Sequence, residues 1–106
     1  MRLEIHTFDP ELLAVLMGRD TVKEGDELPL ADGSTLRYER TFGRRVKHFP
    51  LILHFSVEIR SESGPADIAE WLFDRAGRRN IEKVLVDYQD ARLDASLLQG
   101  LLQGGI

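Results

Sequence analysis

The strongest constraint on the fold of this chain is an unbroken alternation of apolar and polar residues from Leu51 to Arg60. The apolar positions are Leu51, Leu53, Phe55, Val57 and Ile59. Successive side chains of an extended strand point to opposite faces, so a period of two places all of these residues on one side. We therefore predict a half-buried β-strand here.

Other segments predict further strands and helices. Strands are indicated at 3–6, 28–30, 36–42 and 81–88, with a very short return strand through Leu93 after a turn at 89–90. Helices are indicated at 10–17 with Asp9 as N-cap, at 64–76, and after Asp94 or Ser96.

The order strand, helix, strand around residues 64–76 allows a parallel pair joined by a right-handed crossover. We therefore predict one α+β domain over residues 1–106, with a mixed sheet of about four to five strands and two to three helices packed on it, in the order βα-ββ-αβ-α. Leu36, Tyr38 and Phe42 are predicted to share the core face of their strand, and Gly43 to mark a hairpin turn or bulge.

Composition narrows the class of protein. The 106 residues carry a net charge of -4 and include no cysteine. The lack of cysteine excludes disulfide frameworks and thiolate nucleophiles, and it fits a reducing cytoplasm. The N-terminal residues lack the apolar core of a signal sequence, and no apolar run is long enough to cross a bilayer. We therefore expect a cytoplasmic protein with no membrane partner.

Residues 37–49 form a basic segment in this acidic chain. Their net charge of +4 leaves the remaining residues at -8. The cations are Arg37, Arg40, Arg44, Arg45 and Lys47. Arginine pairs bidentately with carboxylate and with phosphate, so these residues are predicted to bind a partner, either an acidic protein surface or nucleic acid. Cations that protect a sheet edge are the structural alternative.

The choice between these partners depends on the aromatic residues of the basic segment. If Tyr38 and Phe42 face the core, they cannot stack on nucleic-acid bases. This expectation favours a protein partner for the basic segment.

The C-terminal tail repeats the four residues LLQG at 97–100 and 101–104. The repeat stacks two leucine pairs nearly one helical turn apart. These residues are Leu97, Leu98, Leu101 and Leu102. We expect them either to close an amphipathic helix over the sheet or to form a homodimer or partner contact.

The sequence contains no phosphate-binding glycine loop, nucleophile elbow, zinc-protease motif or calcium loop. His6 and His54 are the candidates for acid–base or metal chemistry by residue type. If their strands are neighbours, they share a sheet face with Glu4 and Glu58 and could bind a metal or act as an acid–base pair. Surface or hydrogen-bonded sheet residues are the simpler interpretation, so no catalytic residue, metal ligand or cofactor is assigned.

Three functional hypotheses follow. The preferred one is a non-enzymatic protein-binding module that acts through surface complementarity, as bacterial inhibitor, immunity and accessory proteins do. The second is a nucleic-acid-binding accessory protein that uses a basic hairpin at 37–48. The third is a small enzyme or a metal site around His6 and His54.

Overall fold

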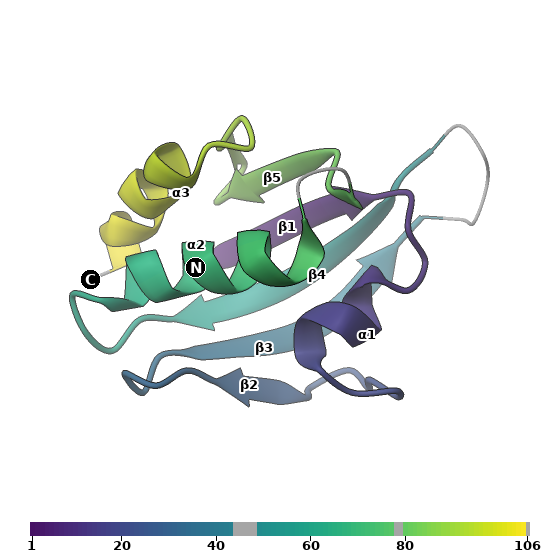
Figure 1. Cartoon of the computed structure of the whole chain (residues 1–106), viewed down its shortest axis with the longest axis horizontal. Coiled ribbons are helices and arrows are strands. Elements are labelled where there is room, and N and C mark those ends of the chain that lie inside the picture. The colour runs from purple at the N-terminus through teal and green to yellow at the C-terminus, as the bar shows by residue number, and fades with distance from the viewer. Residues whose placement is uncertain (44–48, 78–79, 106) are drawn as a thin grey trace.

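The computed structural model describes residues 1–43, 49–77 and 80–105. Within these residues, six strands form one antiparallel sheet in the order β2-β3-β4-β1-β5-β6. The strands are β1 (Arg2–Thr7), β2 (Glu27–Pro29), β3 (Thr35–Phe42), β4 (Leu51–Glu58), β5 (Lys83–Val86) and β6 (Gln89–Asp90). The helices are α1 (Leu12–Met17), α2 (Gly64–Ala76) and α3 (Ala95–Leu102), followed by a 3-10 turn, Gln103–Gly105. The three α-helices lie on one side of the sheet (Figure 1).

The predicted α+β class is confirmed, but the predicted mixed sheet is wrong. Every described strand pair is antiparallel, and the sheet has six strands instead of four or five. β4 and β5, which are joined through α2, do run in the same direction because each is antiparallel to β1. They are not paired, because β1 lies between them.

The position of β1 defines the topology of the molecule. The elements β1-α1-β3-β4-α2-β5 follow the β-α-β-β-α-β order of the split β-α-β, or ferredoxin-like, motif. β2 and β6 extend this sheet at its two edges. Both edge strands are short, as is common in proteins that avoid pairing with other sheets.

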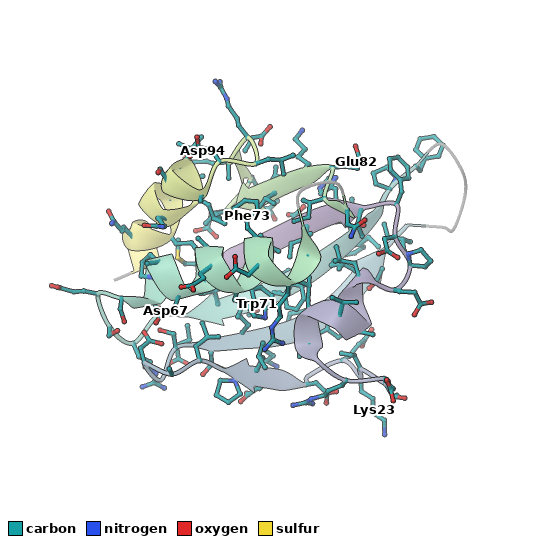
Figure 2. The ribbon with its side chains drawn as sticks, in the orientation of Figure 1. Lys23, Asp67, Trp71, Phe73, Glu82 and Asp94 are labelled. Atoms are coloured by element: carbon teal, nitrogen blue, oxygen red, sulfur yellow. The ribbon has the colours of Figure 1, made fainter. Side chains whose placement is uncertain are left out.

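The core lies between the sheet and the helices. The strands contribute the buried residues Leu3, Ile5, Leu36, Leu53, Phe55 and Val84. The helices contribute Leu12, Leu16, Ile68, Leu72, Leu98 and Leu102. Trp71 of α2 (Figure 2) is also buried, and its indole Nε1 donates a hydrogen bond of 2.9 Å to the carbonyl oxygen of Leu16. This bond connects α2 to the C-terminal end of α1.

Hydrogen bonds to aspartate side chains bear on where α1 and α3 begin. Asp94 caps α3 as one of the two predicted residues, since its Oδ1 accepts a hydrogen bond of 2.9 Å from the Leu97 amide. The prediction for α1 is wrong by two residues. Asp9 does not cap this helix but accepts from the Glu11 amide in a turn, and α1 begins at Leu12. The Asx turn that the Asp9 side chain forms with the Glu11 amide competes with a helix start at this position.

A β-bulge in β3 reverses the face on which its last residues lie. Tyr38 pairs with Phe55 but Arg40 pairs with His54, so Glu39 is an extra residue in β3. The insertion shifts the alternation by one position. Phe42 therefore lies on the face opposite to Tyr38 and is 39% exposed, whereas Tyr38 is 6% exposed. The prediction that Phe42 faces the core is wrong for this reason.

Among the described helices, none combines the length and the apolar character that crossing a bilayer requires.

Candidate functional site

The sheet face that points away from the helices, called the open face below, carries the candidate site. No described helix covers it (Figure 1). Its central side chains, placed by the strand register, are Arg2, Glu4 and His6 of β1, Arg37, Arg40 and Phe42 of β3, His54 and Ser56 of β4, and Lys83 and Leu85 of β5. This face holds most of the polar residues that the sequence singles out for chemistry.

Glu4 lies at the centre of the open face and is only 8% exposed. The Nε atom of Arg2 donates a hydrogen bond of 2.6 Å to Glu4 Oε1. The Nε2 atom of His6 lies 3.8 Å from Glu4 Oε2, and His54 is directly opposite Glu4 on β4. His6, His54 and Glu4 are therefore neighbours, as expected, because β1 and β4 are adjacent strands.

Glu58 is on the same face but near the end of β4, where it pairs with Thr35 across the strands and forms an ion pair of 2.8 Å with Arg60. It therefore stays apart from the histidines. Within the described part of the chain, no group of three metal-ligating side chains could hold a metal ion. The arrangement thus offers an acid beside two histidines, but no set of ligands for a metal.

Both histidines are shifted toward the neutral form. Burial lowers the pKa of His6, and the nearby Glu4 carboxylate partly offsets this effect. Burial and the positive charge of Arg2 lower the pKa of His54. His6 Nε2 and His54 Nδ1 are buried without a hydrogen-bond partner among the described residues. A protonated form of either ring would place another charge beside Arg2 or Lys83.

An arginine–aromatic row crosses the open face next to Glu4. It consists of Arg2, Arg40, Phe42, His54 and Tyr88. The Arg2 guanidinium carbon lies 5.2 Å from the ring centre of Tyr88 and 5.9 Å from that of Phe42. Arg40 lies 5.7 Å from the same Phe42 ring, which stacks on His54 with ring centres 6.3 Å apart. The three arginine–ring distances are within the range of cation–π attraction.

Tyr88 reaches this row from the turn between β5 and β6. The predicted strand at 81–88 is therefore too long, because β5 ends at Val86 and the turn falls at Asp87 and Tyr88, before the predicted position at 89–90. Both turn residues are left-handed, with φ angles of 47° and 69°. The turn is joined to β1, since the Arg2 amide donates to Asp87 Oδ1 at 2.8 Å and the Asp87 amide donates to the Arg2 carbonyl at 2.9 Å.

The structure describes two of the five basic residues predicted to bind a partner. Arg37 and Arg40 both lie on the open face. Arg37 forms an ion pair of 3.5 Å with Glu39 and lines a shallow depression of about 220 Å³ with Glu27 and Glu58. Arg44, Arg45 and Lys47 lie outside the described residues. That these cations bind a partner stays a prediction.

The four leucines of the tail occupy different environments. Leu98 and Leu102 are fully buried in the core, and Leu101 is partly buried against it. Leu97 is 40% exposed. The helix thus closes over the core, which is the first of the two expected roles. A homodimer contact through this helix stays a prediction, with Leu97 as its most accessible member.

Comparisons with protein-family models, with curated proteins and with solved structures each gave no match. The geometry of the open face is therefore the main indication of a function. Its two most informative residues, Arg2 and Tyr88, are not singled out by the sequence. They are far apart along the chain, and only the pairing of β1 with β5 brings them together.

Proposed function

We propose that the protein is a non-enzymatic protein-binding module whose contact surface is the open face, centred on the arginine–aromatic row. The observation that carries this proposal is the exposure of Phe42 (39%) and Tyr88 (71%) beside arginine side chains. Aromatic residues and arginine are enriched in protein interfaces and supply most of their binding energy. The proposal agrees with the preferred hypothesis from the sequence but moves the contact toward β1 and β5.

The charge of the row favours an acidic partner. Arg2 is paired with Glu4, whereas Arg40 forms no ion pair with any described residue. In the sequence, Arg44, Arg45 and Lys47 follow closely after Phe42 and are predicted to add to this positive charge. The positive charge of Arg40 would steer an acidic surface toward Phe42.

The shape of the open face also fits a macromolecular partner. The depression beside Arg37 has a volume of about 220 Å³. Small-molecule sites are usually deeper clefts of roughly 300–1,000 Å³ that bury most of the ligand. Among the described residues of this face, a depression of this size beside exposed aromatic side chains is better suited to contact with another protein.

The test is affinity capture from the cell of origin, with quantification of the proteins retained. We expect the double variant Phe42→Ala/Tyr88→Ala to lose the proteins that the wild type retains specifically. Val15→Ala is the matched control, because Val15 of α1 is 48% exposed on the helix side. Equal retention by the wild type and the double variant would disprove the role of the open face.

Nucleic acid is the second candidate partner, and one observation favours it. The bulge turns Phe42 outward, so it could stack on a base, as aromatic residues do on sheets that bind single-stranded RNA. Glu4 and Glu39 on the same face oppose a phosphate backbone. If nucleic acid is the partner, the wild type should bind single-stranded RNA at low salt, and the variant Arg44→Glu/Arg45→Glu should not. Absence of binding by the wild type would exclude this function.

A further inference from the structure

We infer that Arg2 is the receptor for a carboxylate group of the partner protein, held in place by Glu4, Phe42 and Tyr88. This inference rests on the proposed function and names the chemistry of its contact. It assigns the acidic side chain of a partner aspartate or glutamate to one guanidinium group at the centre of the row.

The hydrogen bonds of Arg2 leave one edge of its guanidinium available. Nε donates to Glu4 Oε1, and the backbone amide and carbonyl of Arg2 bond to Asp87. Neither Nη atom donates to another described residue. The Arg2 side chain is 30% exposed. Two parallel N–H donors on this edge match the two oxygens of a carboxylate.

The surroundings fix this group before a partner arrives. Arg2 sits on a central strand, its Nε is bound to the buried Glu4, and its guanidinium lies against the rings of Tyr88 and Phe42. Flexible arginines lose side-chain entropy when they bind, whereas a side chain that is already ordered loses less. The Arg2 guanidinium is thus a preorganised hydrogen-bond donor.

The conformation of Tyr88 is a separate observation that supports a ligand here. A turn with two left-handed residues favours asparagine and glycine, whereas a bulky aromatic residue at positive φ is strained. Tyr88 has φ of 69° and is 71% exposed, so burial does not compensate for this strain. Its described contact is the guanidinium of Arg2. The ring is therefore placed to hold Arg2 and to cover one side of what Arg2 binds.

Local charge distinguishes a protein carboxylate from a nucleic-acid backbone. Arg40 approaches the same Phe42 ring as Arg2, so a second positive charge lies beside the Arg2–Glu4 pair. One carboxylate neutralises that charge. A chain of phosphates would have to continue past Glu39 or Glu58, which repel it. The arrangement therefore favours a localised anion.

The inference can be tested with a defined probe, an acetylated and amidated peptide of alternating glutamate and glycine. Its binding is followed by NMR, with the Nε–H signal of Arg2 as the reporter. We expect this signal to be among those that move most on titration in the wild type. We expect Arg2→Lys, which keeps the charge but loses the forked donors, to weaken binding about tenfold.

Arg60→Lys is the matched control, since Arg60 is an exposed arginine paired with Glu58. It should change the affinity less than about twofold, in line with the small effect of exposed ion pairs. If the Arg2 Nε–H signal of the wild type does not move on titration, the inference is wrong, and this readout does not depend on the folding of Arg2→Lys. Equal affinity of a folded Arg2→Lys variant and the wild type also overturns the inference. Tighter binding of a short oligothymidylate than of the peptide also overturns it.

The outcomes separate this inference from the proposed function. If the captured cellular partner depends on Phe42 and Tyr88 but binds Arg2→Lys as tightly as wild type, the protein-binding function stands and the role of Arg2 is wrong. If the variant Phe42→Ala/Tyr88→Ala retains the partner, the proposed surface itself is wrong.

Discussion

Glu4 of β1 lies directly opposite His54 of β4, and the Nε2 atom of His6 is 3.8 Å from the same carboxylate. The open face is thus not an ordinary solvated surface, because its central acid is nearly buried and has neutral imidazoles on two sides. The Arg2 guanidinium forms an ion pair with this carboxylate and balances its negative charge. The stability of the sheet and the charge of its open face therefore depend on the same few side chains.

The histidines predict a loss of stability in mild acid. The pKa of both His6 and His54 is lower in the folded state than the ordinary value of 6.5, mainly because of burial. The unfolded chain therefore takes up protons first as the pH falls, and stability declines from about pH 6.5 downward. Urea unfolding should show a lower midpoint at about pH 5.5 than at about pH 7.5.

The matched variant is His54→Gln, which should reduce this pH dependence. The Asp32 carboxyl does not interfere in this range. Hydrogen bonds from Ser34 and Ser61 lower its pKa, so its contribution is lost only below the ordinary value of 3.8. A urea midpoint that is constant or rises on acidification would contradict the assignment of buried neutral histidines.

Gly64 is predicted to be required at the start of α2. A Cβ atom at this position would lie 2.7 Å from Ser34 Oγ and 2.9 Å from Ile59 Cγ2. Gly64→Ala should therefore lower the free energy of unfolding by about 1–3 kcal/mol. Gly100→Ala is the control, because nothing lies within 4 Å of its added Cβ. This exposed change within α3 should raise stability by up to about 1 kcal/mol, and equal effects in denaturant melts would refute the packing argument.

Two adjacent leucines of α3 should respond differently to truncation. Leu98 is fully buried, so Leu98→Ala should cost about 2–5 kcal/mol of unfolding free energy. Leu97 is 40% exposed, and Leu97→Ala should cost about 1 kcal/mol or less of unfolding free energy.

Gel filtration of the Leu97→Ala variant also tests the homodimer prediction. If the wild type is a dimer through this helix, the Leu97 variant should elute later.

Tyr88→Gly should separate stability from binding. Glycine removes the strain of the left-handed backbone at position 88, while loss of the ring removes a cation–π contact of roughly 0.5–1 kcal/mol with Arg2. We expect the free energy of unfolding to stay within about 1 kcal/mol of wild type, because the two effects oppose each other. Affinity for the acidic peptide should fall. A variant that unfolds at room temperature would show that Tyr88 has a mainly structural role.

The parts of the fold with strong local signals could be predicted from the sequence. The alternation at Leu51–Glu58 and the apolar stripe of α2 are such signals, and so is the cap at Asp94. The place of β1 could not be predicted, because a strand–helix–strand order allows either paired or separated strands. Nothing in the local pattern of Leu3 and Ile5 shows that this strand lies between β4 and β5.

The candidate site was predicted in part. Alternation brought His6, His54 and Glu4 to one face once their strands proved adjacent. Phe42 was misplaced because the bulge at Glu39 contains no glycine or other local marker. Tyr88 was misplaced for a related reason, since its turn contains neither asparagine nor glycine. The error at Phe42 is a single-residue shift of backbone register, which reverses the face of every later side chain in the strand. The error at Tyr88 is a turn that falls two residues earlier than predicted.

The central place of β1 has a consequence for how the chain is made. This strand is synthesised before the other described strands of the sheet, yet Leu3 pairs with Phe55 on one side and with Val86 on the other. Its apolar residues must therefore wait for most of the chain to be synthesised before the sheet can close around them. Pairings between such distant segments slow folding and leave intermediates with exposed apolar surface, which are prone to aggregate. We thus expect β1 to be the segment most dependent on chaperones during translation.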